Sequence, residues 1–119
     1  NVKVLETEAF RFCGKLKKVT FEKNSKLKEV GYGCFQYCDN LTTITIPGTV
    51  KTIGNYAFER NRNLKTVIFK GKTPKIRTGA FKNVNQDITF KVPKKYKSKY
   101  TKLLKGKKWY KDTMKIVAQ

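Results

Sequence analysis

The sequence predicts an α/β repeat solenoid, in which short strands and helical turns form a right-handed stack of coils closed by a carboxy-terminal helix and strand. The first observation is that one apolar pair recurs four times, at separations of 25, 23 and 23 residues. The second is that apolar residues recur at fixed offsets around each pair. The third is that apolar spacing changes from three and four residues to two within each repeat. The four pairs are Ala9-Phe10, Cys34-Phe35, Ala57-Phe58 and Ala80-Phe81.

Each repeat has two halves with different periods. The segment "LKTVIF" at 64–69 has the L-x-x-L-x-L form of a leucine-rich repeat, and it predicts a short strand around Val67 to Phe69. The segment "IGNYAF" at 53–58 predicts a helical turn or short helix on the opposite side of the coil. Stacked coils would bury the recurrent apolar columns between them. Two such columns are Val19, Ile44, Val67 and Phe90, and Phe21, Ile46, Phe69 and Val92.

After residue 93 the repeat is replaced by a different pattern. Pro93 suits a first helical turn, Tyr100 and Leu104 lie in an apolar stripe at helical spacing, and "MKIV" at 114–117 predicts a last short strand. Trp109 can cover the open end of the core. We therefore expect about four coils of 23–25 residues over 1–93 and a Lys-rich cap over 94–119. The amino end carries no cap, so we expect further repeats before it.

Two stretches carry a family resemblance: "LKEVGYGCFQYCDNLTTITIP" at 27–47 and "IPGTVKTIGNYAFERNRNLKTVIF" at 46–69. They resemble the BspA-type leucine-rich repeat family, with the resemblance covering 1–93 and the end of the chain similar to the closing segment of such proteins. The resemblance implies a secreted or surface-attached protein of bacteria or protozoa, associated with adhesion to host proteins and other cells. The departures from the family pattern are Glu6 and Arg77 at its Gly position, Asn61 and Val84 at its Cys position, and Cys34 at its Ala position.

The net charge is +20, and 24 of the 28 basic residues are Lys. Such a field attracts anionic polymers without specificity. Specific readers of nucleic acid favour Arg, whose planar fork matches guanine and phosphate, so specific nucleic-acid binding is not expected. No apolar run approaches the roughly 18 residues of a membrane span.

Catalytic and metal chemistry have few candidate residues. The chain contains no His, and its eight carboxylates are scattered. Cys13 and Cys38 share one repeat column and Cys34 replaces a small buried Ala, which predicts buried structural thiols. A Cys13–Cys38 disulfide between neighbouring coils is the alternative. We expect no enzyme activity, no cofactor and no metal.

The outward face of the predicted strands is the first candidate site. Between the core positions lie mostly threonines, with one isoleucine and lysines at the ends. Such residues suit a half-exposed strand, and they also form a flat, weakly polar surface on which a protein partner could lie. The face comprises Lys18, Thr20, Thr43, Thr45, Thr66, Ile68, Thr89 and Lys91.

The cap is the second candidate site. Its lysines are either a solvated helix face or a surface for anionic polymers or the cell wall. They are Lys94, Lys95, Lys97, Lys99, Lys102, Lys105, Lys107 and Lys108. The sequence thus favours a non-enzymatic, extracellular or cell-surface module that binds a protein, such as host extracellular matrix or another cell surface, through the strand face. The alternatives are a polyanion-binding element in the cap and a structural spacer.

Overall fold

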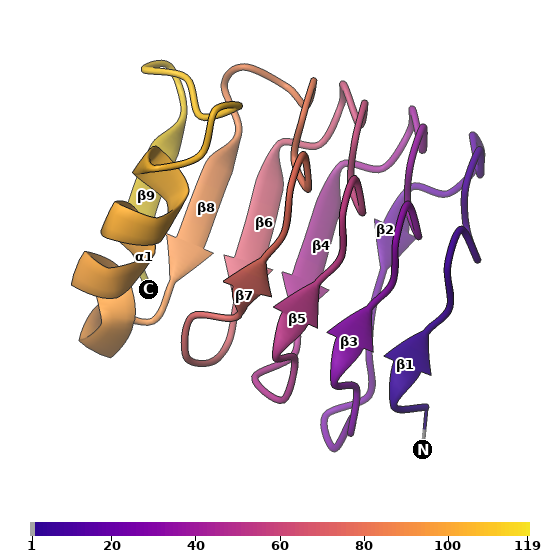
Figure 1. Cartoon of the computed structure of the whole chain (residues 1–119), viewed down its shortest axis with the longest axis horizontal. Coiled ribbons are helices and arrows are strands. Elements are labelled where there is room, and N and C mark those ends of the chain that lie inside the picture. The colour runs from indigo at the N-terminus through magenta and orange to yellow at the C-terminus, as the bar shows by residue number, and fades with distance from the viewer. Residues whose placement is uncertain (1) are drawn as a thin grey trace.

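The computed structural model describes residues 2–119, which form two parallel sheets facing each other across one core (Figure 1). The smaller sheet has the order β1-β3-β5-β7, and the larger one the order β2-β4-β6-β8-β9. The predicted repeat solenoid is therefore confirmed. The strands of the smaller sheet are β1 (Val4–Leu5), β3 (Glu29–Val30), β5 (Thr52–Ile53) and β7 (Lys75–Ile76). Those of the larger sheet are β2 (Lys18–Val19), β4 (Thr43–Ile46), β6 (Thr66–Phe69), β8 (Thr89–Val92) and β9 (Lys115–Ala118).

The strand register reproduces the sequence repeat. Lys18 of β2 pairs with Thr43 of β4, which pairs with Thr66 of β6, and Thr66 pairs with Thr89 of β8. The same separations relate β1, β3, β5 and β7. Residues of one repeat column therefore stack directly on one another, and the extra residues of the first repeat do not disturb the stack.

The half of each coil that begins with a strand of the smaller sheet differs from the helical turn or short helix that its spacing predicts. Ile53 belongs to the two-residue strand β5, and a run of turns follows it over 55–60. Every second N–H of this run donates to the next coil, as Tyr56 does to Thr78 and Phe58 does to Ala80. Helical hydrogen bonds would keep these donors within the coil, whereas the stacked turns use them to join neighbouring coils.

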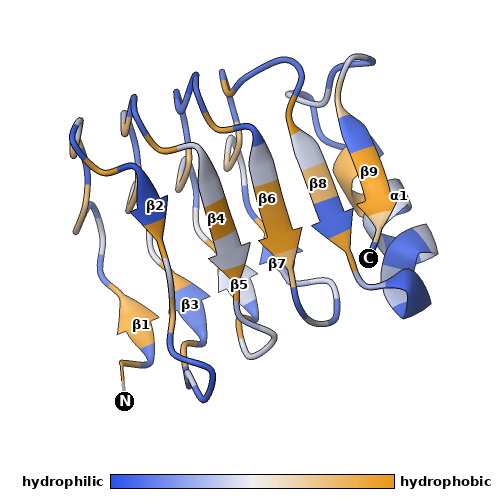
Figure 2. Ribbon diagram, turned by 180° about the vertical axis from the view of Figure 1, so that it is seen from behind, coloured by the Kyte–Doolittle hydropathy of each residue, from blue (hydrophilic) through white to orange (hydrophobic). Residues whose placement is uncertain are grey.

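The core is built from the stacked apolar columns. Figure 2 shows hydrophobic and polar residues alternating along the larger sheet. Its inward side chains, such as Ile44, Val67 and Phe90, are fully buried. Opposite them, Phe35, Phe58 and Phe81 stack face to face with centroids 5.3 and 5.1 Å apart. This aromatic column runs along the stack and, with the aliphatic columns, makes one continuous core.

The last coil is closed by the short helix η1 (Lys94–Tyr96), the helix α1 (Lys97–Lys105) and β9. In Figure 1, α1 continues the layer of the smaller sheet beyond β7, while β9 extends the larger sheet. Tyr100 and Leu104 of α1 are buried, and Trp109 packs edge-on against Phe81 at 5.3 Å. These contacts cover the end of the core, as the apolar stripe and Trp109 predict. Among residues 2–119, no helix combines the length and apolarity that crossing a membrane requires.

Candidate functional site

The outer face of the five-stranded sheet carries the predicted strand-face residues on adjacent strands. Because the register is continuous, they form two columns that run across the sheet. Thr20 lies directly after β2 and outside the strand. The first column contains Lys18, Thr43, Thr66, Thr89 and Lys115, and the second contains Thr45, Ile68, Lys91 and Val117.

The strand alternation fixes the direction of these side chains. In β4, β6 and β8 buried residues alternate with half-buried ones, and the half-buried ones are the column residues. Val117 of β9 is more open, with 42% of its surface exposed. The two columns contain no carboxylate. The face thus presents hydroxyl and methyl groups, with lysines at both ends of the first column and Lys91 within the second, and such a surface is suited to contact with a protein.

Lys115 and Val117 were missed by sequence reasoning. The prediction placed "MKIV" in a last strand but did not place that strand beside β8. The alternation of exposed Lys115 and Val117 with half-buried Ile116 was the available signal, since it is the same alternation that the repeats show.

The cap lysines lie along η1, α1 and the segment that follows them. Seven of the eight are exposed, because α1 turns Tyr100 and Leu104 inward and leaves its basic residues to solvent. Lys107 is different: it is half-buried, and its Nζ donates to the backbone carbonyl of Ile76 at 2.6 Å. The Nζ of Lys95 lies 5.6 Å from the ring centre of Tyr96. The group is therefore spread over the helix surface instead of gathering at one point.

The three cysteines are free thiols. Cys34 and Cys38 are fully buried and Cys13 is half-buried. Burial raises the pKa of Cys34 to about 12 and that of Cys38 to about 11. A thiol held in its neutral form is a poor nucleophile and a poor metal ligand. Within residues 2–119 no group of three or more His, Cys, Asp or Glu residues is arranged to hold a metal ion.

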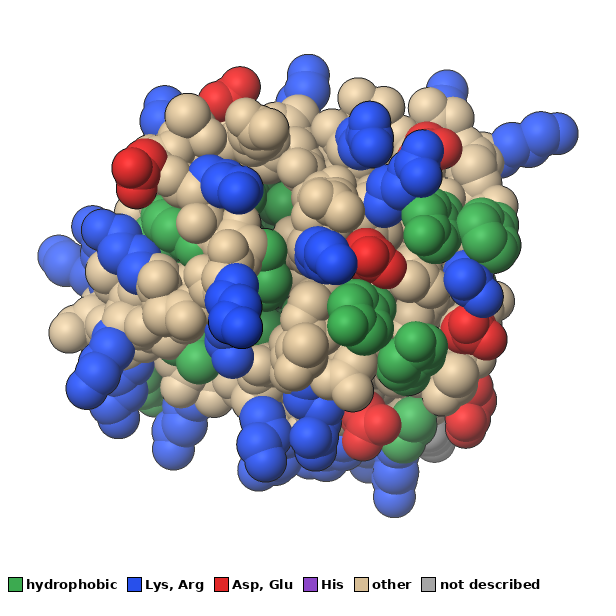
Figure 3. Space-filling model, turned by 45° about the horizontal axis from the view of Figure 1, so that its top comes forward, with side chains coloured by type: hydrophobic (Ala, Val, Ile, Leu, Met, Phe, Trp, Pro, Cys, Tyr) green, Lys and Arg blue, Asp and Glu red, His purple; other side chains and the backbone are tan. Residues whose placement is uncertain are grey.

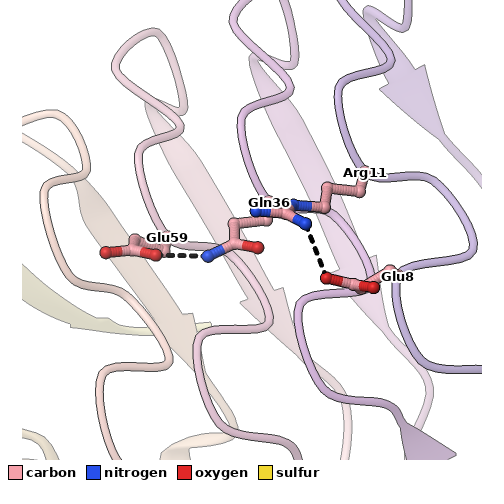
Figure 4. A network of polar contacts seen from close by, with 4 residues as sticks. All are labelled: Glu8, Arg11, Gln36 and Glu59. Carbon is pink, nitrogen blue, oxygen red and sulfur yellow. Dashed lines mark hydrogen bonds and ion pairs between the residues drawn. The ribbon is translucent and has the colours of Figure 1, made fainter.

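A ridge of turns connects the two sheets along one side and carries polar contacts between coils (Figure 4). Arg11 donates to Glu8 at 2.7 Å within the first coil. Gln36, which is buried, donates from its Nε2 to Glu59 of the next coil. These contacts pair Glu8 and Glu59 with donors, so they act in holding the turns together.

The ridge also carries aromatic side chains. Phe12 stacks on Tyr37 with ring centres 5.0 Å apart, and Tyr32 meets Tyr56 edge-on at 5.9 Å. Arg11 lies over Phe12 at 4.6 Å. The three-and-four spacing of this half of the repeat indicated a helix and so gave no sign of this ladder.

Comparison with known families identifies the repeat. A family model described as the BspA type leucine rich repeat region matches residues 1–108 in six copies. The match extends beyond residue 93, so the division of the chain into repeats and cap at that point stays a prediction. The matched region is a kind of domain that is usually non-catalytic and typically binds protein at a surface. Neither curated proteins nor solved structures gave a match.

Proposed function

Because the chain belongs to the BspA-type leucine-rich repeat family, we propose that it is a non-enzymatic adhesion module that binds a protein partner through the outer face of its five-stranded sheet. The proposed location is the cell surface or the extracellular space, since families of this type are generally surface proteins. The proposed partners are host extracellular-matrix proteins or proteins of another cell surface.

The observation that carries the proposal is the continuity of the outward columns, the first from β2 to β9 and the second from β4 to β9. Ile68 and Val117 place aliphatic groups within a face that is otherwise Thr and Lys. A Thr at either position would suit a half-exposed strand equally well. The aliphatic side chains of Ile68 and Val117 therefore favour contact with another protein. The smaller sheet is a weaker candidate, because its strands have two residues each and its outward residues include Glu29 and Lys75.

The test is binding of the purified chain to immobilised extracellular-matrix proteins at low and high salt. The variant Thr43→Glu/Ile68→Glu places a carboxylate in each column. Each new carboxylate has a lysine as its cross-strand neighbour, Lys18 beside position 43 and Lys91 beside position 68. The sheet should therefore remain stable while its contact surface changes.

The matched control is Thr7→Glu/Thr52→Glu, which changes the net charge equally. Thr7 lies in the turns after β1 and Thr52 lies in β5 of the smaller sheet, so neither belongs to the outward columns. We expect binding that persists at high salt, that is lost in the Thr43→Glu/Ile68→Glu variant and that is retained in the control. Binding that disappears at high salt and is equal in both variants would show attraction by charge alone. That result would contradict the proposal and favour the polyanion-binding role of the cap lysines.

A further inference from the structure

A pocket of about 700 Å³ lies where the last coil of the stack meets the cap. Its walls come from β7 and the turn after it, over 75–86, and from the segment 106–114 that follows α1. Asn55 and Tyr56 of the preceding coil complete it. This volume falls within the range of small-molecule sites in proteins. In the view of the turn ridge, basic side chains prevail toward the cap end of the molecule (Figure 3).

The charge of the pocket has one sign. Six of its lining residues are basic and none is acidic. Lys107 is fixed in the wall by its bond to the Ile76 carbonyl, so its charge stays at the pocket. Like charges around a recess reinforce each other's potential and favour an anion inside it. The six residues are Lys75, Arg77, Lys82, Lys107, Lys108 and Lys111.

The pocket also has an apolar wall, which includes Trp109. Trp109 is only 7% exposed, and its Nε1–H is buried without an acceptor among the described residues. The indole therefore contributes its ring to the wall of the pocket. Ile76, Val84 and Met114 add aliphatic and thioether groups beside the indole. A bare inorganic ion would use the cations but would leave this apolar wall in contact with water.

We propose that the pocket binds a compact sugar that carries sulfate or phosphate groups. The anionic groups would lie against the basic rim, and the C–H face of the sugar ring would lie on the apolar wall beside the indole of Trp109. The pocket shares Lys107 and Lys108 with the predicted cap lysines, but no lysine of η1 or α1 lines it. It is also separate from the outer face of the five-stranded sheet.

The chain has a single Trp, which provides a direct readout. The ¹⁵N-labelled protein is titrated with a trisulfated heparin disaccharide, with glucose 6-phosphate and with unmodified glucose, and the indole N–H resonance of Trp109 is followed. We expect a saturable shift with the sulfated or the phosphorylated sugar and none with glucose. The tighter of the two anionic sugars identifies the kind of anionic group that the site prefers.

The variant Arg77→Gln/Lys82→Gln removes two charges from the rim, and both side chains are exposed, so the fold should be unaffected. Its affinity should fall by about tenfold or more. The control Lys94→Gln/Lys97→Gln removes the same charge from η1 and α1 and should change the affinity by less than about twofold. An equal loss in both variants, or a shift that never saturates, would overturn the proposal and leave only diffuse attraction to the basic surface.

Discussion

Cys38 and Asn61 occupy the same position in successive coils, and both donate to a carbonyl of the coil before them. The Sγ of Cys38 lies 3.1 Å from the oxygen of Phe10, and the Nδ2 of Asn61 lies 2.8 Å from the oxygen of Phe35. The second N–H of Asn61 reaches the Phe58 carbonyl at 2.8 Å, in its own coil. By the same pattern, the Phe58 carbonyl would accept a hydrogen bond from the side chain of the next residue in the column. That residue is Val84, whose side chain has no donor. Asn61 and Val84, which both depart from the Cys of the family pattern, therefore compensate for each other, because Asn61 supplies the donor that Val84 lacks.

This relationship predicts coupling between positions 61 and 84. Asn61→Cys keeps one donor and leaves the buried Phe58 carbonyl without one, but it also removes the buried Oδ1 of Asn61, which has no donor, so the predicted quantity is the coupling with position 84 and not the loss in this variant alone. Val84→Cys in that background returns a donor to the carbonyl and should recover about 1 kcal/mol. Urea unfolding of the wild type, both single variants and the double variant measures the coupling. If Val84→Cys has the same effect in the wild-type background as in the Asn61→Cys background, the compensation is wrong.

The phenylalanine column predicts an unequal response along the stack. Phe58 is fully buried between Phe35 and Phe81, whereas Phe10 is 38% exposed and has a ring neighbour on one side only. Phe58→Ala should cost about 3–5 kcal/mol, and Phe10→Ala well under half of that. Denaturant midpoints of the two variants measure the difference. Equal losses would mean that the first coil is as tightly packed as the third.

The buried thiols predict a loss of stability in alkali. An unfolded thiol loses its proton near pH 9.0, while burial raises the pKa of Cys34 to about 12 and that of Cys38 to about 11. The folded chain holds these protons longer than the unfolded chain does. The stability is therefore complete below pH 9 and falls as the pH rises from there toward the folded pKa values. Each thiol should contribute a slope of about 1.4 kcal/mol per pH unit.

The control for this prediction is Cys34→Ala, because Ala57 and Ala80 already fill the same position in the next two coils. Other groups that titrate in alkali are common to both proteins, so the difference between them isolates Cys34. The variant should unfold like the wild type at neutral pH and show a smaller slope above pH 9. Identical slopes in the two proteins would show that Cys34 ionises as freely in the folded chain as in the unfolded one.

The repeat spacing was enough to predict the strand register, because side chains of one column must stack for the core to be continuous. It was not enough to predict the smaller sheet. Strands of two residues, such as Thr52–Ile53, are too short to show a period of two. In the turns that follow, Tyr56 and Arg60 have φ of 58° and 60°. Gly is the residue expected in this left-handed conformation, so the large side chains at these positions did not indicate it in the sequence.

The two candidate sites also differ in how far the sequence could predict them. The outward columns follow from alternation within the strands, so the Thr and Lys residues of β4, β6 and β8 were found. The pocket combines Lys75, Lys82 and Lys111, which lie in separate segments and whose charge cannot be told from that of other surface lysines without the fold. Trp109 was predicted to cover the core, which it does, but its unpaired N–H depends on contacts that only the folded chain defines.

The attachment of the cap predicts a specific effect of one hydroxyl group. Tyr100 of α1 is fully buried, and its hydroxyl lies 2.7 Å from the carbonyl oxygen of Gly71 and 2.9 Å from that of Lys72. This polar contact joins α1 to the loop before β7, and the ring of Tyr100 also packs on Phe69 at 5.0 Å. Tyr100→Phe keeps the ring and removes the donor, so it should lower the free energy of unfolding by about 1 kcal/mol.

Tyr96→Phe is the matched control, since Tyr96 is only half-buried. Hydrogen exchange of the loop 71–74 separates a local effect from a global one, because this loop should open more often once α1 no longer holds its carbonyls. We expect faster exchange there in Tyr100→Phe and unchanged exchange in β4 and β6 under conditions where local opening dominates. Equal stability losses in the two variants, or exchange in the loop that stays as slow as in the wild type, would mean that packing alone holds the cap in place.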